Sequence, residues 1–322
     1  MSARFAMGSE SSSFRPKRHP SDSPDAPNKK RPPVGDEALL ADAEDAITQD
    51  EIHGAELQSD KPSKSGKIRN AFSELMAPKP KPETKAVSAS SRMNTSSFAG
   101  RDGLGLYIAK AETLPAGSII FANPRFVAIH DMYPKATVHC LLLPRSPDKT
   151  LLHPFDAFED AEFLASVRAE AANLKDLVAR ELQRLVGEHS AAEAPRRAVL
   201  EGEVEPERDA EGKAVIPQGR DWMSEVRVGV HARPSMNHIH VHVLSRDMYS
   251  NRLKVRKHYN SFTTDFFVPL DDFPLAMDDP RRNQAGWHEK PMVCWRCGRD
   301  FGNKLKELKK HLGEEFDEWK RE

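Results

Sequence analysis

The sequence has little of several features that mark secreted or membrane proteins. Only three cysteines occur in 322 residues, and two of them form one Cys-x-x-Cys pair, which is too few for a disulfide framework. No run of about 18 apolar residues is present, so we expect nothing to span a membrane. The first residues also lack the apolar core of a secretory signal. We therefore expect a protein of a reducing compartment whose thiolates bind a metal.

A net charge of -1 conceals charges that are segregated along the first third of the chain. Residues 1–35 carry seven Lys or Arg and three acidic groups, 36–60 carry nine acidic groups and no Lys or Arg, and 61–101 carry nine Lys or Arg and two acidic groups. Residues 1–95 are rich in Ser and Pro and poor in aromatics, so they bury too little apolar surface to offset chain entropy. We predict a disordered tail with basic and acidic blocks, in which 61–85 is either an arm for a polyanion or only a solubilising segment.

Two short basic clusters in this tail, at 15–20 and 29–33, are typical of a nuclear import signal. They indicate a nuclear location. The segment 68–78 has apolar residues at helical spacing, which suits a helix that folds on a partner or forms only transiently.

The pattern changes to that of a packed α+β domain after about residue 96. Apolar residues at helical spacing predict one long amphipathic helix over 159–186. The polar, unpatterned residues 187–221 are too many for a connection inside a compact domain, and we predict an insertion loop there. Turn residues separate β-rich runs that predict an antiparallel sheet, with strands in 117–130, 136–145, 225–232 and 238–245.

Histidines alternate with apolar residues in the last of these strands. Residues two apart share one face of a strand, so we expect His238, His240 and His242 to lie in a row. Neighbouring imidazoles in such a row are about 7 Å apart, and a metal would need further ligands from elsewhere. Histidine can instead attack phosphorus through one ring nitrogen while its neighbours set the tautomer. We favour this nucleophilic role over a metal site or an exposed polar strand face.

The stretch "HIHVHVL" and the upstream "AIHDMYPKATVHCLLLPR" resemble, in order and spacing, the signature of the histidine triad superfamily of nucleotide hydrolases and transferases. The resemblance implies that His240 is the nucleophile, which takes AMP as a histidyl-nucleotide intermediate. His238 and His242 would flank it. His139, in the upstream stretch, would be the fourth histidine of the site.

The same resemblance implies that Asp131 binds the ribose hydroxyls and that Ser235 contacts phosphate. An acidic side chain can accept two hydrogen bonds from a diol, and a serine hydroxyl can donate one to a phosphate oxygen. Lys135 could stabilise the charge on phosphate oxygens without a metal. No acidic cluster for Mg²⁺ is evident near the motif, so we expect no metal in catalysis.

A second group of candidate ligands lies near the C-terminus. Cys294 and Cys297 form the Cys-x-x-Cys pair, and His311 follows in a predicted helix. Two thiolates and one imidazole are three ligands of a tetrahedral structural Zn²⁺ site. Glu315 lies one helical turn after His311 on the same face, so we predict it as the fourth ligand, with Glu314 as the competing choice. Without a metal, the two cysteines would be buried or redox-active thiols.

A zinc finger with two cysteines, one histidine and one glutamate behind a histidine triad domain resembles the aprataxin family, the DNA deadenylases of single-strand break repair. The resemblance covers about 100–322 and implies a short form without a forkhead-associated domain. It divides the chain into the tail 1–95, a catalytic domain 96–270 and a linker with the finger at 271–322. It implies hydrolysis of 5′-adenylated DNA left by abortive ligation, with AMP as product. We separately expect the tail to contact repair proteins. Nicked or broken DNA would be held through its phosphates by the finger and by Lys254, Arg256, Lys257 and His258.

Two other functions share part of this pattern. A general histidine triad hydrolase of dinucleoside polyphosphates or nucleoside phosphoramidates would use His240 but needs no zinc finger or basic arm. A non-catalytic zinc-finger DNA-binding protein would tolerate the loss of the histidines. The finger helix carries six basic and six acidic groups over 301–322, so its DNA contact rests on the resemblance rather than on its charge.

Overall fold

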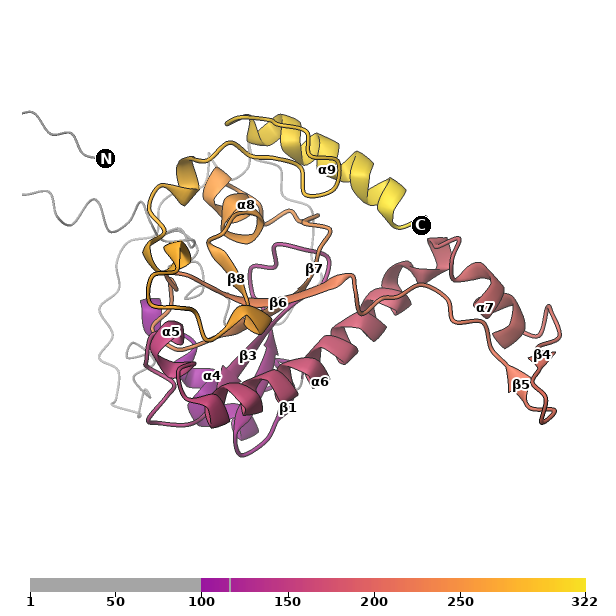
Figure 1. Cartoon of the computed structure of the whole chain (residues 1–322), viewed down its shortest axis with the longest axis horizontal. Helices are drawn as coiled ribbons and strands as arrows, with labels where there is room; N and C mark the ends of the chain where they lie inside the picture. The colour runs from indigo at the N-terminus through magenta and orange to yellow at the C-terminus, as the bar shows by residue number, and fades with distance from the viewer. Residues whose placement is uncertain (1–99, 116) are drawn as a thin grey trace, which may run out of the picture.

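The described part of the chain, residues 100–115 and 117–322 of a computed structural model, is built around one antiparallel sheet (Figure 1). The sheet has six strands in the order β1-β2-β3-β7-β6-β8, and every neighbouring pair is antiparallel. This architecture confirms the predicted α+β fold. The strands are β1 (Ile119–Ala122), β2 (Phe126–His130), β3 (His139–Pro144), β6 (Val226–His231), β7 (Val241–Ser245) and β8 (Phe267–Pro269).

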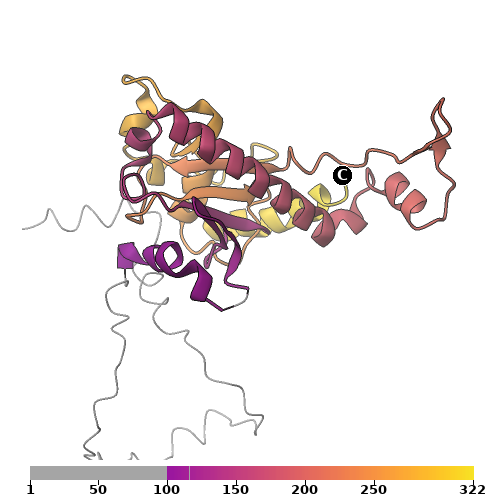
Figure 2. The same ribbon diagram turned by 90° about the horizontal axis from the view of Figure 1, so that it is seen from below.

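One face of the sheet is covered by the long helix α6 (Ala161–Val186), which packs on β3, β6 and β7 (Figure 2). Asp160 caps the helix by accepting hydrogen bonds from two backbone N–H groups of its first turn. Among the apolar residues at helical spacing in α6, Leu177 and Leu185 are exposed. The others form the main core with the sheet and include Phe163, Leu164, Val167, Leu174, Val178, Leu182 and Val186.

The opposite face carries two separate helices. α4 (Gly105–Lys110) lies on β2, next to a small core that includes Leu104. α8 (Arg256–Thr263) lies at the other side, near β8, where Phe262 is part of a second core. The histidines of the two central strands lie on this face, between the two helices. Shorter elements connect these parts, namely 3-10 turns at Gly100–Asp102 and Ala111–Thr113 and the one-turn helix α5 (Pro154–Ala157).

The histidine strand is shorter than predicted. β7 begins at Val241 rather than at 238, and His238 lies in a bend. Continuing the pairing of β7 with β3 would place Ile239 opposite Pro144, which has no N–H group to donate. The Ile239 N–H donates instead to the Thr150 carbonyl at 2.7 Å. The predicted row of three side chains on one strand face is therefore wrong for His238.

Residues 187–221, predicted to be an insertion loop, contain short elements and project from the body of the molecule as an arm (Figures 1 and 2). At the base of this arm, buried Glu193 accepts hydrogen bonds from Trp222 Nε1 at 2.6 Å and from the Arg220 N–H at 3.0 Å. These bonds tie the arm to the approach to β6. The elements of the arm are a 3-10 turn (Gly187–His189), α7 (Ala194–Leu200) and the hairpin of β4 (Glu207–Arg208) and β5 (Ala214–Val215).

The C-terminal segment packs directly on the sheet domain. Trp295 Nε1 donates to the Asp247 carbonyl at 2.9 Å, and Tyr259 Oη donates to the Val293 carbonyl at 2.9 Å. The first bond reaches the end of β7 and the second reaches α8. The segment consists of 3-10 turns at Leu270–Asp272, Pro280–Asn283 and Trp287–Glu289, followed by the final helix α9 (Leu305–Trp319).

The C-terminal end of α9 packs against the base of the arm. The Arg220 guanidinium lies between two indole rings, 4.7 Å from the centroid of Trp222 and 4.8 Å from that of Trp319. It also donates to the Trp319 carbonyl at 2.7 Å. The Ala191 N–H donates to the Arg321 carbonyl at 2.8 Å. The C-terminal segment is thus attached to the rest of the structure both before α9 and at the end of α9.

The predictions for residues 1–95, including the basic clusters at 15–20 and 29–33 and the helix in 68–78, lie outside the described residues. They stay predictions. Within the described part, no helix is both long and apolar enough to cross a membrane.

Candidate active site and zinc centre

His240 stands immediately before β7, and its ring is almost fully buried. Its Nδ1 lies 2.8 Å from the His238 carbonyl, which can only accept a hydrogen bond. The proton of the neutral ring is therefore on Nδ1, and Nε2 keeps a lone pair. A neutral imidazole with a fixed proton and a free lone pair is the form in which histidine acts as a nucleophile.

A hydrogen-bonded pair of histidines from the two central strands lies beside His240. The Lys135 N–H donates to His139 Nδ1 at 3.2 Å, which leaves the proton of neutral His139 on Nε2. This Nε2 lies 3.0 Å from His242 Nδ1, which then accepts and leaves the His242 proton on Nε2. His242 Nε2 is buried and has no hydrogen-bond partner among the described residues. Since the ring centroids of His240 and His242 are 5.0 Å apart, an unpaired donor lies beside the nucleophile.

Burial holds these histidines in the neutral form. It lowers the pKa of His139 from 6.5 to about 4, although the Asp131 carboxylate opposes the shift. It also lowers the pKa of His240 and shifts the pKa of His242 well below its usual value. The positive charge of Lys135 is a further cause for His139 and His242. Neutral rings at neutral pH are what a nucleophilic histidine requires.

Asp131 and Lys135 both lie against this cluster. Asp131 Oδ2 is 3.5 Å from His139 Nε2, while its Oδ1 accepts the Tyr133 N–H at 2.7 Å. Lys135 is buried, and its Nζ donates to the Tyr133 carbonyl at 2.8 Å. The ligand atoms of Asp131, His139 and His242 lie within 4.8 Å of one another, close enough to share a metal ion. The two imidazole nitrogens of that set are already hydrogen-bonded to each other.

His238 and Ser235 belong to the bend before β7. Ser235 is buried, and His238 is half-buried with its Nδ1 inside the protein. Arg101 holds this bend by donating from Nη2 to the Pro234 carbonyl at 3.1 Å. His238 borders a hollow of about 240 Å³ that is also lined by Leu151, Leu152, Met236 and Ile239. Its backbone carbonyl orients His240, and the residue also lines this hollow.

The sequence reasoning missed His231, at the end of β6. Its ring centroid lies 4.4 Å from that of His242, 4.7 Å from Phe262 and 5.1 Å from Phe266. Burial lowers the pKa of His231 well below its usual value. The neutral His231 ring therefore packs against His242, together with the rings of Phe262 and Phe266. The sequence places it in a predicted strand, but nothing in the sequence says which strand lies beside the histidine strand.

Asp247, another residue that the sequence reasoning missed, organises the loop that precedes β3. Its buried carboxylate accepts hydrogen bonds from the Thr137 N–H at 3.0 Å, from Thr137 Oγ1 at 2.8 Å and from the Tyr249 N–H at 2.9 Å. Burial raises the pKa of this carboxyl group, and the hydrogen bonds oppose that shift. Thr137 is two residues before His139, so Asp247 fixes the backbone conformation immediately before His139.

Four predicted zinc ligands converge between the C-terminal turn and α9. The ligand atoms of Cys294, Cys297, His311 and Glu315 all lie within 4.8 Å of one another. Cys297 Sγ is 3.0 Å from His311 Nε2, and the same nitrogen is 3.0 Å from Glu315 Oε1. Two sulfurs, one nitrogen and one oxygen form a donor set that suits tetrahedral Zn²⁺. These residues fit a structural zinc ion.

Glu315, rather than Glu314, completes this set. The Glu314 carboxylate lies 3.8 Å from His311 Nδ1, the ring nitrogen that faces away from the cysteines, and its side chain is 60% exposed. The Glu315 side chain is 8% exposed and points to the cysteines. Arg296 pairs with the Glu315 carboxylate and orients it. Gly298, at φ 74°, makes the left-handed turn that follows the second cysteine.

The predicted DNA-contacting residues lie at the start of α8. Lys254 is exposed, and Arg256 and Lys257 are half-buried. His258 is fully buried, and its Nδ1 lies 3.1 Å from both the Lys254 nitrogen and the Arg252 carbonyl. The prediction that His258 contacts DNA is therefore wrong, because its ring is buried and contacts the backbone of the 252–254 loop.

Lys309 of α9 adds a basic group that the sequence reasoning did not select. Its Nζ donates to the Leu253 carbonyl at 3.1 Å. Burial lowers the pKa of Lys309, and the neighbouring charge of Lys254 adds to the shift. Adjacent positive charges are thus presented by the sheet domain and by the finger.

Comparison with known proteins identifies both parts of the chain. Residues 115–249 match the family model of the HIT (histidine triad) domain, and residues 263–318 match that of a C2HE / C2H2 / C2HC zinc-binding finger. The chain is 31% identical over 253 residues to the aprataxin-like protein of Schizosaccharomyces pombe, an alignment that covers 79% of this chain and 95% of the relative. The chain belongs to the aprataxin family.

Further aprataxin relatives agree with this assignment. The aprataxin-like protein of Saccharomyces cerevisiae is 33% identical over 221 residues, which cover 67% of this chain and 96% of the relative. The crystal structure of the aprataxin ortholog Hnt3 in complex with DNA matches the fold with a TM-score of 0.53 at 28% identity, over 68% of this chain and 96% of that chain. The resemblance inferred from the histidine and cysteine motifs is confirmed.

Proposed function

We propose that this aprataxin-family chain removes AMP from the 5′ end of adenylated DNA, the product of abortive ligation, in single-strand break repair. One observation carries the proposal: the His238 carbonyl holds His240 Nδ1 at 2.8 Å, so that Nε2 keeps its lone pair. The likeness to an aprataxin ortholog solved in complex with DNA supports DNA as the substrate.

In the first step, His240 Nε2 attacks the phosphorus of the AMP group. A phosphorus–nitrogen bond forms, and the phosphorus–oxygen bond to the 5′-phosphate of the DNA breaks. The electron pair of that bond leaves with the 5′-phosphorylated DNA, and histidyl-AMP remains. The substituted ring carries a positive charge, which the hydrogen bond from Nδ1 to the His238 carbonyl stabilises.

His242 donates to the reacting phosphate in this scheme. Its Nε2–H group is buried and lacks a partner among the described residues, so a phosphate oxygen placed there would satisfy it. A fixed donor aimed at developing charge lowers the barrier of a phosphoryl-type transfer. His139 holds His242 in the donating tautomer through the 3.0 Å bond between their rings. The leaving phosphate is already acidic, so it needs little proton donation.

In the second step, water attacks the phosphorus and the phosphorus–nitrogen bond breaks. The electron pair returns to His240 Nε2, the water oxygen stays on AMP, and its proton passes to solvent. We place the ribose of AMP at the Asp131 carboxylate, which lies 3.5 Å from His139 Nε2 and accepts hydrogen bonds.

DNA is held by its phosphates along Lys254 and Lys309. These lysines come from two segments and are close enough for the Lys254 charge to affect the pKa of Lys309. Phosphate contacts position a duplex without reading its sequence, which suits breaks that occur anywhere. Zinc bound by the four ligands would stabilise the fold of the finger and thereby the position of α9.

The test is AMP release from a nicked duplex that carries a 5′-adenylate. We expect release by the wild-type chain and loss of at least about 1,000-fold for His240→Ala, since a nucleophile has no substitute. His189→Ala is the matched control, because His189 lies exposed in the arm. No release by the wild type, or undiminished release by His240→Ala, contradicts the proposal.

The same assay separates the two other functions considered. A general nucleotide hydrolase would cleave dinucleoside polyphosphates or nucleoside phosphoramidates at least as fast as adenylated DNA. A DNA-binding protein without activity would retain affinity for the nicked duplex and release no AMP. The buried histidine pair is costly to maintain in a protein without activity, because its polar groups must be desolvated.

A further inference from the structure

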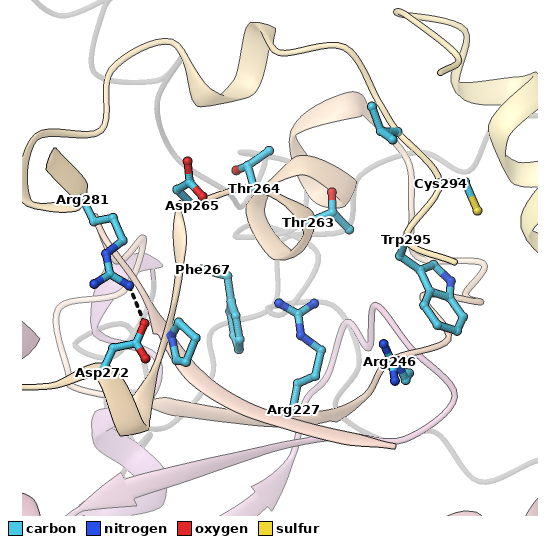
Figure 3. A pocket seen from close by; sticks show the side chains of 12 residues that line it. Arg227, Arg246, Thr263, Thr264, Asp265, Phe267, Asp272, Arg281, Cys294 and Trp295 are labelled. Carbon is cyan, nitrogen blue, oxygen red and sulfur yellow. Dashed lines mark hydrogen bonds and ion pairs between the residues drawn. The ribbon is translucent and has the colours of Figure 1, made fainter. Parts of the chain in front are cut away.

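A second hollow lies on the histidine-bearing face of the sheet, but behind α8 (Figure 3). Its volume is about 510 Å³, and it is bounded by β6, the end of β7, the end of α8 and the first turn of the finger. Phe262 of α8 separates it from the active site. The Phe262 ring contacts His242 with centroids 5.1 Å apart, whereas its carbonyl accepts a hydrogen bond from Arg227 in the hollow at 2.6 Å.

Two arginines point into this hollow from neighbouring strands (Figure 3). Arg227 of β6 is opposite Leu244 in the strand register, and Arg246 follows two residues later on the same side. This diagonal arrangement places their side chains next to each other. Burial lowers the pKa of Arg227 to about 10, and the charge of Arg246 contributes to the shift. The fold therefore places two like charges together, which is costly unless an anion joins them.

Arg227 lacks an acidic partner. Its guanidinium lies over the Phe267 ring at 4.5 Å from the centroid. Among the described residues, the guanidinium donates one hydrogen bond, to the Phe262 carbonyl. No carboxylate of the described residues lies within ion-pair distance of it. Most of its five N–H donors are free to bind a ligand.

Arg246 is also available. It lies over the Trp295 ring at 5.1 Å, and its side chain is 44% exposed. Its nearest carboxylate, Glu225, is 4.0 Å away and is already bound by Arg220 at 2.8 Å and by Trp319 Nε1 at 2.9 Å. Arg246 therefore shares one carboxylate with Arg220 and Trp319, at the outer limit of ion-pair distance.

The acidic groups at the rim have other partners. Asp272 pairs with Arg281, which also binds Asp279 at 2.8 Å. Asp265 is 69% exposed and lies 3.5 Å from Lys290. These pairs leave the positive charge of the hollow on Arg227 and Arg246.

We propose that this arginine pocket, formed by Arg227, Arg246 and Trp295, binds a phosphate group at a site separate from the histidines. Guanidinium groups match the geometry of phosphate oxygens and are the preferred side chains for binding them. The hollow is larger than a phosphate ion, so the group can belong to a mononucleotide or to a nucleic-acid strand that continues past the finger. The Trp295 ring, over which Arg246 lies, forms the wall of the hollow beside that guanidinium.

The test uses the full zinc-loaded chain and the indole N–H signals of its four tryptophans. The Trp295 signal is assigned by its absence in Trp295→Phe. Inorganic phosphate, AMP and a short single-stranded oligonucleotide are titrated separately, and we expect a saturable shift of the Trp295 signal. A shift with inorganic phosphate or AMP identifies a free-anion site. A shift with the oligonucleotide alone identifies strand phosphate.

Three variants decide whether the pocket causes the shift. Arg246→Gln and Arg227→Gln should each weaken binding at least about ten-fold, because a hydrogen bond to a charged group is worth roughly that factor. Arg227→Lys keeps the charge and should bind with intermediate affinity. Arg184→Gln is the control, since Arg184 is exposed on α6 and pairs with Glu181.

Two results overturn the proposal. One is that none of the three probes moves the Trp295 signal. The other is a shift that survives both Arg246→Gln and Arg227→Gln with unchanged affinity, because it would then come from the histidine site. The readout does not use AMP release, so the deadenylase proposal and the arginine pocket can fail independently.

Discussion

The buried histidines predict that acid destabilises the fold in a specific pH window. Burial lowers the pKa of His139 to about 4 and the pKa values of His231 and His242 well below 6.5. In the unfolded chain each ring regains a pKa of about 6.5. As the pH falls below that value, the unfolded state binds protons that the folded state does not. The free energy of unfolding therefore decreases with falling pH.

The size of the effect follows from the two pKa values. For His139, stability is lost from about pH 6.5 down to the folded pKa of about 4 and amounts to about 3 kcal/mol in total. Between about pH 7.5 and about pH 5.5, one histidine that stays neutral in the folded state removes about 1.3 kcal/mol. Ordinary surface histidines contribute far less, because their pKa values are similar in both states.

Urea unfolding of the wild type and of His231→Leu, at both pH values, measures this contribution. His231 lies among Phe262, Phe266 and the His242 ring, so leucine suits its surroundings. The variant should lose about 1.3 kcal/mol less than the wild type on acidification. Acid release of zinc affects both proteins equally and cancels in the difference.

His189→Leu is the matched control, because the same substitution is made at an exposed ring. Its loss of stability on acidification should equal that of the wild type. If His231→Leu also loses as much as the wild type, His231 is protonated in the folded state, and the neutral cluster is refuted.

Three further predictions concern the packing around the site. Gly229→Ala should destabilise the fold by about 1–3 kcal/mol, because a Cβ there would lie 2.7 Å from Phe267 Cζ. Urea unfolding measures this loss, and an unchanged urea midpoint would contradict the prediction. Trp295→Phe removes the hydrogen bond to the Asp247 carbonyl and should lower the melting temperature by about 2–4 °C, which a thermal scan would measure. Chelation of zinc should abolish amide protection in α9 in hydrogen exchange and weaken binding to nicked duplex; retained protection would show that the finger folds without metal.

The parts of the fold that rest on local spacing were predictable from the sequence. The helix over 159–186 follows from apolar periodicity, and the structure has it at Ala161–Val186. The zinc ligands follow from the spacing of Cys294, Cys297 and His311, because a knuckle and one helix carry all of them. One helical turn then places Glu315, and the structure separates it from Glu314 by side-chain direction.

Features that depend on strand order and on burial were not predictable in the same way. His231 meets His242 only because β6 lies beside β7, and the sequence does not state that order. His258 lies in a basic stretch that looks exposed, yet the first turn of α8 buries it. The start of β7 depends on Pro144 in the partner strand, which interrupts the hydrogen bonds that would have extended the strand to His238.

The finger and the histidine site are linked through a short series of hydrogen bonds. Trp295 of the finger binds the Asp247 carbonyl at 2.9 Å, and the Asp247 carboxylate binds Thr137, two residues before His139. The loop around Thr137 has no regular structure, so it depends on these side chains for its conformation. Loss of the finger fold removes a contact from this series, and it also displaces Lys309 from the surface that we propose for DNA. The zinc finger of this aprataxin-family chain therefore supports the geometry of the histidine site, in addition to any contact that it makes with DNA.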